Sequence, residues 1–122
     1  MKKADLIKKI KSITPKTIKV LGVDFNIRFN HKVPKADRAD RTYAFTIGDD
    51  REITIYVRRI TSMDQFKSTL IHELLHAAIH VSGVTNSLNE EQEESVVMCL
   101  EVLVNGLMRF KDFSLETQET VE

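Results

Sequence analysis

The stretch that decides the fold is residues 61–83, TSMDQFKSTLIHELLHAAIHVSG. Apolar side chains recur here at the spacing of an amphipathic helix, until Ser82-Gly83 ends the pattern. These side chains are Phe66, Leu70, Leu74, Ala77, Ala78 and Val81. At the other end, Thr61-Ser62 can cap the helix and Asp64 suits its positive first turn. The segment therefore predicts one long helix.

Upstream of this helix the sequence has the pattern of β-structure. Residues 17–21 and 23–29 alternate apolar with other side chains on either side of Gly22, which is typical of a β-hairpin. Residues 43–47 and 52–57 alternate in the same way around a turn-rich connection. We therefore expect two strand pairs, with a polar, aperiodic loop over residues 30–41 between them.

The two ends of the chain predict further helices. Residues 4–10 form a short amphipathic pattern with Leu6, Ile7 and Ile10 on one side. A second long helix is expected from about Leu88 to Phe110, because acidic residues begin the segment and basic residues end it. The whole order predicts an α+β fold: an N-terminal helix, a small antiparallel-rich sheet of about four strands, then two long helices.

Length and composition limit the possible functions. The 122 residues suit a single domain, 1–122, with a flexible acidic tail over about 114–122. Lys and Arg together number 18, as do Asp and Glu, so the charge suggests no affinity for nucleic acid or membrane. No stretch reaches transmembrane length, and no signal peptide is expected. The one cysteine, Cys99, has apolar neighbours and predicts a buried side chain in a cytoplasmic protein.

The centre of the long helix reads His72-Glu73-Leu74-Leu75-His76. Two histidines four residues apart share one helical face, about 6 Å apart along the axis, so both imidazoles can reach one ion. Zinc takes nitrogen ligands at about 2.0–2.1 Å, so the motif predicts Zn²⁺ held by His72 and His76. Glu73 lies one position round the helix, where it can act as general base on a water that the zinc polarises.

A catalytic zinc site needs a third protein ligand. His80 continues the series, but it lies about 12 Å from His72 along a straight helix, which argues against it. The other candidates begin the second helix: Glu90, Glu91, Glu93 and Glu94. The expected buried face of that helix is marked by Val97, Leu100 (or Glu101), Val104 and Leu107 or Met108. One turn back from this face lie Glu93 and Glu94, and the spacing leaves both open.

The stretch STLIHELLHA at residues 68–77, followed by EESVV at residues 93–97, resembles a known family. It is similar to the compact metallopeptidase domains of the gluzincin type, in particular the ImmA/IrrE-like proteins and small phage-borne relatives. The resemblance covers roughly residues 17–110 and is specific only at the zinc motif. In those families a small residue commonly follows the acidic ligand, which favours Glu94, before Ser95, over Glu93. The better-known members have alanine there and an aromatic residue four positions after the ligand, where this chain has Ser95 and Met98.

What the resemblance implies is zinc-dependent hydrolysis of a peptide bond in a cytoplasmic protein, such as a regulatory protein. An edge strand over Ile53–Val57 would then hold an extended substrate by main-chain pairing. Tyr43 and Tyr56 could assist an oxyanion, although a tyrosine on a half-buried strand more often serves packing.

Two other classes of function compete with turnover. The zinc could only staple the two helices together, as metals do in small domains. Glu73 speaks against this, because a structural site has no use for a base beside the metal. Alternatively, the chain could be a zinc-stapled binding or regulatory module of peptidase descent without turnover, and the sequence is compatible with it.

Overall fold

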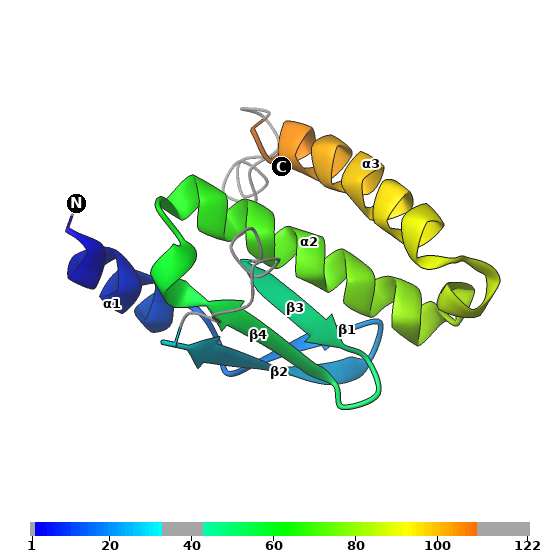
Figure 1. Ribbon diagram of the computed structural model, residues 1–122, viewed down its shortest axis with the longest axis horizontal. Helices are drawn as coiled ribbons and strands as arrows, with labels where there is room; N and C mark the ends of the chain where they lie inside the picture. The colour runs from blue at the N-terminus through cyan, green and yellow to red at the C-terminus, as the bar shows by residue number, and fades with distance from the viewer. Residues whose placement is uncertain (1, 33–42, 110–122) are drawn as a thin grey trace, which may run out of the picture.

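The computed structural model describes residues 2–32 and 43–109 of the chain, and Figure 1 shows its arrangement. The elements in chain order are α1 (Lys3–Ile13), β1 (Thr17–Val20), β2 (Val23–Asn30), β3 (Ala44–Ile47), β4 (Glu52–Tyr56), α2 (Met63–Ser82) and α3 (Glu90–Met108). Two short 3-10 turns, η2 (Val57–Arg59) and η3 (Val84–Ser87), precede and follow α2. The predicted α+β order of one helix, four strands and two long helices is confirmed. Most of the predicted loop at 30–41 and all of the tail at 114–122 lie outside the described residues.

The four strands form one mixed sheet in the order β1-β2-β4-β3. β1 pairs antiparallel with β2 and β3 antiparallel with β4, as the two predicted hairpins require. β2 and β4 then join in parallel, with Ile27 opposite Ile53. The prediction that residues 53–57 form an edge strand is therefore wrong, because β4 lies between β2 and β3, and β1 and β3 are the edge strands. Burial agrees with this position: Ile53, Thr54 and Ile55 are all buried, as expected of a strand with a neighbouring strand on each side.

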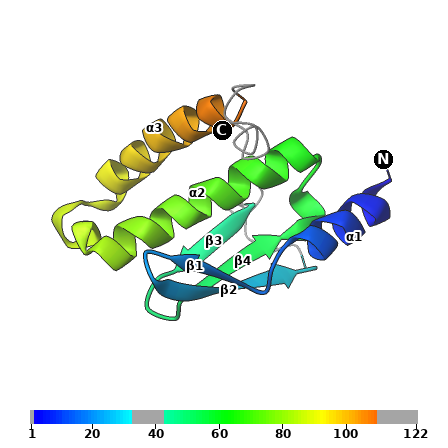
Figure 2. The ribbon, with the colours of Figure 1, turned by 180° about the vertical axis from the view of Figure 1, so that it is seen from behind.

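The sheet, α2 and α3 lie in that order as three layers, which Figure 2 shows from behind. Phe25, Ile53 and Ile55 are fully buried between the sheet and the helices. Phe66 and Ala77 supply the facing side of α2. α1 adds Leu6 and Ile10 to the same core, as its amphipathic pattern predicts. No helix among the described residues is long and apolar enough to cross a membrane.

The predicted ends of α2 are confirmed. The Ser62 side chain accepts a hydrogen bond from the Gln65 backbone N–H, which caps the helix start. Gly83 has a φ of 82°, a left-handed conformation that glycine adopts without strain, and it ends the helix. After the η3 turn, Asn89 and Gln92 form a reciprocal capping box at the start of α3. These caps fix where the two long helices face each other.

The inner face of α3 differs in part from the expected one. Val97 is fully buried as predicted, and Glu101 faces α2 where Leu100 was the first choice. Leu100, Leu107 and Met108 are exposed, and among the described elements α3 packs mainly on α2. Cys99 is exposed as well, so the prediction that it is buried is wrong.

Candidate metal centre

Two imidazoles of α2 converge on one point between the long helices. His72 and His76 are half-buried, and their Nε2 atoms lie 3.3 Å apart. Two ligand atoms in a tetrahedral site with bonds of about 2.0–2.1 Å are separated by about 3.3–3.4 Å. The two nitrogens are therefore already at the spacing of a shared ion.

The carboxylate of Glu94 meets both nitrogens from α3. Its Oε1 lies 2.8 Å from Nε2 of His72, and its Oε2 lies 3.1 Å from Nε2 of His76. One ligand atom from each of the three side chains falls within 4.8 Å of the others. Of the two glutamates that the spacing left open, Glu94 is the one that α3 brings to the Nε2 atoms.

The other ring nitrogen of each histidine contacts a second carboxylate of α3. Nδ1 of His72 lies 2.8 Å from Oε2 of Glu101, and Nδ1 of His76 lies 2.7 Å from Oε2 of Glu93. Because an ionised carboxylate only accepts, each Nδ1 donates its proton to its carboxylate, so Nε2 is the nitrogen left to bind a metal ion. This carboxylate–histidine pairing is the arrangement that orients metal-binding histidines.

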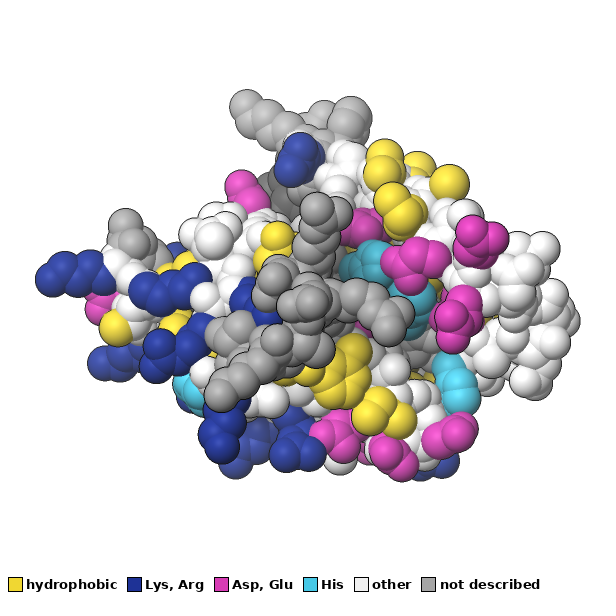
Figure 3. Space-filling view, viewed as in Figure 1, with side chains coloured by type: hydrophobic (Ala, Val, Ile, Leu, Met, Phe, Trp, Pro, Cys, Tyr) yellow, Lys and Arg dark blue, Asp and Glu magenta, His cyan; other side chains and the backbone are white. Residues whose placement is uncertain are grey.

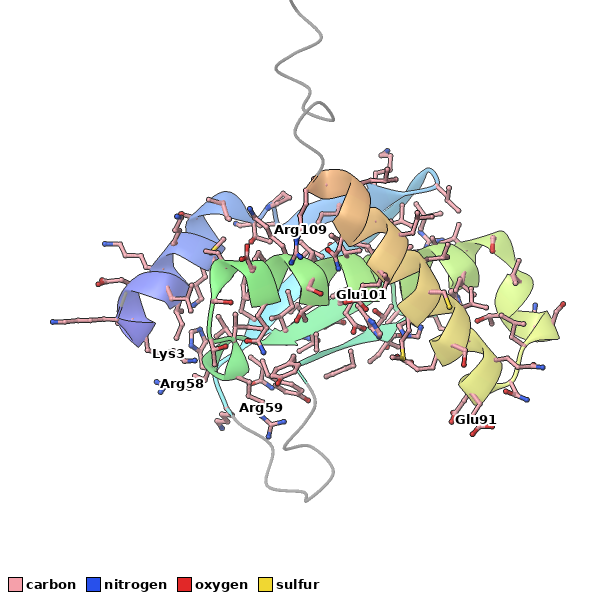
Figure 4. The ribbon with its side chains drawn as sticks, turned by 90° about the horizontal axis from the view of Figure 1, so that it is seen from above. Lys3, Arg58, Arg59, Glu91, Glu101 and Arg109 are labelled. Carbon is pink, nitrogen blue, oxygen red and sulfur yellow. The ribbon has the colours of Figure 1, made fainter. Side chains whose placement is uncertain are left out.

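Neutral side chains hold those two carboxylates in turn. Ser68 donates to Oε1 of Glu101 at 2.6 Å, and Asn105 donates to the Ser68 hydroxyl at 3.4 Å. Thr85, in the η3 turn, donates to Oε1 of Glu93. Figure 4 shows Glu101 reaching from α3 over α2. Both histidines are thus oriented by networks that extend beyond their immediate partners.

The carboxylates around the histidines make it more favourable for the site to hold a positive charge. Burial lowers the pKa of His72, but the hydrogen bond to Glu101 and the charges of Glu73, Glu94 and Glu101 outweigh it and raise the pKa. For Glu101, burial raises the pKa, but hydrogen bonds from Ser68 and His72 outweigh it and lower the pKa. For Glu93, too, burial raises the pKa, but hydrogen bonds from Thr85 and His76 outweigh it and lower the pKa. The pocket therefore favours a bound cation, whether a proton or a metal ion.

Glu73 lies on the sheet side of the two histidines. Its side chain is only 6% exposed, and its Oε1 accepts a hydrogen bond of 2.8 Å from the Thr46 hydroxyl of β3. Burial raises its pKa, although the Thr46 hydrogen bond and the histidines oppose this. A carboxyl group with a raised pKa beside a cation site has the properties of a general base.

A cleft of about 1040 Å³ opens over these groups, between β3 and the two long helices. His72, His76 and all four glutamates of the centre line it, and Figure 3 shows histidine and acidic side chains gathered on this face. The adjoining strand β3 is an edge strand. Because Tyr56 N donates to Tyr43 O, odd-numbered residues pair with β4, and the main-chain groups of Ala44 and Thr46 point to the open edge.

The remaining predicted residues lie at different distances from this centre. Tyr43 lines the cleft and is 39% exposed, whereas Tyr56 is packed under Arg59 and beside Phe45. His80 is outside the three-residue group, as the helical spacing predicts. Its ring lies against the β3–β4 turn, so close to Gly48 that a Cβ there would fall 2.3 Å from it. Its Nε2 is 3.4 Å from Asp49.

Five contributors to the centre were not assigned a role from the sequence: Thr46, Ser68, Thr85, Glu101 and Asn105. Glu101 was noted only as an alternative position on the buried face, yet a lone charge amid an apolar helix was a usable signal. Thr46 and Thr85 gave no local signal, because their roles depend on how β3 and η3 pack against α2 and α3.

Comparison of the chain with protein-family models, with curated proteins and with solved structures finds no match. The interpretation of this centre therefore depends on the geometry of its own residues.

Proposed function

We propose that this protein is a zinc-dependent metallopeptidase of the gluzincin type, with His72, His76 and Glu94 as zinc ligands and Glu73 as general base. The observation that carries the proposal is the convergence of the two Nε2 atoms and the Glu94 carboxylate, with both Nδ1 atoms bonded to other carboxylates. A chance cluster of exposed acidic groups has no reason to include two histidines held in one tautomer by separate partners.

The donor set fits zinc. Two imidazoles and one carboxylate are the protein ligands of many catalytic zinc sites, and they leave a fourth position for water or substrate. When bound, zinc would lower the pKa of a water and polarise a peptide carbonyl. Glu94 is 49% exposed, so its side of the centre is open to solvent and substrate.

Glu73 supplies proton transfer in this proposal. Its buried carboxylate accepts a proton from the attacking water and passes it to the leaving amine. Thr46 donates to one oxygen, Oε1, which leaves the other oxygen, Oε2, for the reacting water. The raised pKa of Glu73 brings the carboxyl closer to neutral pH, where such a base is most effective.

The substrate would be an extended segment of a protein or peptide, such as a regulatory protein in the cytoplasm. The outward main-chain groups of Ala44 and Thr46 can pair with it along the edge of β3. Among the described residues, the lining of the cleft includes no lysine or arginine, whereas it includes Glu90 beyond the centre. We therefore expect segments with basic side chains to be preferred.

A metal and activity assay tests this function. Purified wild type is expected to hold about one zinc per chain and to cleave members of a lysine- and arginine-rich peptide library. Glu73→Gln should keep the zinc and the fold but lose turnover, and His76→Ala should lose both zinc and turnover. A wild type without stoichiometric metal would refute the zinc site. Zinc binding with no cleavage of any peptide in the library would refute the peptidase.

A zinc-stapled binding module is the second candidate, and one observation favours it. On the inner face of α3 the only fully buried apolar side chain is Val97, and the hydrogen bonds and ion pairs between described residues of α3 and α2 belong to the centre and its supporting network. A metal could therefore serve mainly to hold α3 in place. In that case Glu73→Gln would leave metal content, stability and every binding property unchanged.

A further inference from the structure

The outer face of the sheet, on the side away from α2, differs between the two edge strands. On β1 this face carries Thr17 and Lys19, and Lys19 pairs with Asp24 of β2 at 3.6 Å. On β3 it carries Phe45 and Ile47, and Ile47 is 40% exposed. Natural sheets commonly use charged side chains to keep other strands from pairing with an open edge. The strand β3 has no charged side chain, so its edge lacks this protection.

A hollow of about 480 Å³ lies on this outer face beside β3. Thr54 of β4 is only 8% exposed and lies at its floor. Phe45 and Ile47 line the side toward the open edge, where Figure 3 shows hydrophobic side chains below the histidines. On the opposite side, Arg28 and Glu52 form an ion pair with each other at 2.5 Å. The part of the hollow that β3 forms is therefore suited to apolar side chains.

We propose that the segment which pairs with β3 carries apolar side chains at alternate positions, and that these pack on Phe45 and Ile47. This rests on the proposed function, which supplies the pairing of an extended segment with β3. Because the side chains of a strand alternate between the two faces of a sheet, the residue opposite Thr46 faces the metal centre and its neighbours face outward. The recognised class is therefore a basic residue, as the acidic cleft favours, between two apolar residues.

The main-chain geometry of β3 brings the outer side chains into contact. The open main-chain groups of Ala44 and Thr46 would hydrogen-bond the segment, so Phe45 lies between the two bonded positions. In an antiparallel ladder the residue opposite such a position comes closest, with Cα atoms about 4.5 Å apart. Its side chain would pack on the Phe45 ring, which has the Tyr56 ring behind it at 5.8 Å between centroids. Ile47 offers the next contact on the same face, two residues along the strand.

The charges favour a separate segment over a second copy of this chain. Two β3 strands that pair antiparallel about a twofold axis would keep both α2 helices on the same side of the continuous sheet. The two clefts would then lie next to each other. Each is lined by the glutamates of the centre and, among the described residues, by no lysine or arginine. Like charges brought together in this way repel, whereas a basic segment is attracted.

The first test compares two nine-residue peptides of identical composition, with glycine and serine at both ends. The alternating peptide has valine on each side of a central lysine and threonine beyond; the exchanged peptide swaps each valine with its neighbouring threonine. Binding to the full chain carrying Glu73→Gln, with one equivalent of zinc added, is measured by calorimetry. We expect the alternating peptide to bind about tenfold more tightly, because each apolar cross-strand pair strengthens binding several-fold. Equal affinities, or no binding of the alternating peptide at millimolar concentration, overturn the proposal.

Variants of β3 test whether its outer face makes this distinction. Phe45→Ser and Ile47→Ser should each reduce the preference for the alternating peptide to about threefold or less, with little change for the exchanged peptide. Ile47 is the more exposed of the two, so Ile47→Ser serves as the test if Phe45→Ser does not fold. Ile13→Ser, at an apolar side chain of α1 that is 52% exposed, is the matched control and should keep the full preference. An unchanged preference in folded Ile47→Ser overturns the proposal.

Cleavage by wild type separates this proposal from the proposed function. A wild type that cleaves neither peptide while the tenfold binding preference holds refutes the peptidase and leaves the recognition on β3 standing. A wild type that cleaves both peptides with equal kcat/KM refutes the recognition and supports the peptidase. Sedimentation equilibrium tests the other occupant: a wild-type dimer that Ile47→Ser dissociates would place a second copy on the β3 edge and overturn the proposal.

Discussion

The hydroxyl of Thr46 lies 2.8 Å from Oε1 of Glu73 and 3.1 Å from the backbone oxygen of the same residue. One side chain of the edge strand thus holds both the main chain and the carboxylate of the proposed base. This contact joins the strand that would bind substrate to the helix that would bind metal, and it gives the first prediction.

Thr46→Val removes the hydroxyl with little change in shape. Because the Thr46 hydrogen bond lowers the pKa of Glu73, its loss should raise that pKa further. Since the base must be ionised, the acidic limb of the kcat/KM profile should move to higher pH. Zinc content should not change. Thr69→Val, on another hydroxyl that lines the cleft, is the control and should leave the profile in place.

Glu101→Gln tests the carboxylate behind His72. The variant keeps a hydrogen-bond acceptor for Nδ1 but removes the negative charge, so zinc affinity should fall by about tenfold to a hundredfold. Competition with a chelating dye measures this loss. Glu91→Gln removes a charge from an exposed position on the same helix and should change the affinity little. Equal losses in both variants would show a general effect of charge rather than support of His72.

Zinc binding should weaken as the pH falls from 8 to 6. The pKa of His72 is raised above its ordinary value of 6.5, so the metal-free protein increasingly holds a second proton on this imidazole as the pH falls, and zinc must displace that proton. Each proton released costs up to about tenfold in affinity per pH unit below that pKa. Calorimetry in buffers of different ionisation enthalpy should detect the proton release. A titration that is independent of buffer and pH would contradict the prediction.

The stability of the metal-free protein should follow the opposite trend in this range. A histidine whose pKa is raised in the fold stabilises it below the unfolded value, and that stabilisation is lost as the pH rises through the folded value. Urea unfolding after chelation should therefore give a slightly higher midpoint near pH 6 than near pH 8. Glu93 and Glu101 have lowered pKa values, so the stability that their ionised carboxylates give to the fold is lost only at more acidic pH.

Gly48→Ala should destabilise the fold, because the new Cβ would lie 2.3 Å from the His80 ring. Overpacking of this kind costs about 1–3 kcal/mol. In a His80→Ala background the same substitution should cost much less, since the ring is the group that it meets. A double-mutant cycle by urea unfolding measures the difference. Equal costs in both backgrounds would place the strain in the β3–β4 turn rather than at His80.

Local sequence signals predicted most of the fold. Ser62 and Gly83 fixed the ends of α2, because capping depends on a few neighbouring residues. The place of β4 was missed, since hairpin signals describe pairing between consecutive strands and not the parallel pairing of β2 with β4. The run Ile53-Thr54-Ile55, which is rich in β-branched residues, was the available sign of an interior strand.

For the proposed site, the sequence predicted the residues on α2 but not the separate roles of those on α3. His72, Glu73 and His76 share one helix, so their relation follows from helical geometry alone. The spacing on α3 reduced the acidic candidates to Glu93 and Glu94, but the roles of these two depend on how α2 and α3 face each other. The apolar periodicity predicted that Leu100 faces α2. In the structure Glu101 faces α2 instead, because its carboxylate contacts His72.

The separation of the centre's residues along the chain bears on how the protein folds. Both histidines of the centre and its three carboxylates from α3 lie between residues 72 and 101, in two helices joined by the short η3 connection. Once the two helices have formed, the loop left to close is the short η3 connection and costs little chain entropy, whereas the parallel β2–β4 pairing must bring together residues 26 positions apart in each pair. We therefore expect the α2–α3 hairpin to form early in folding, and zinc to bind it before the sheet is complete.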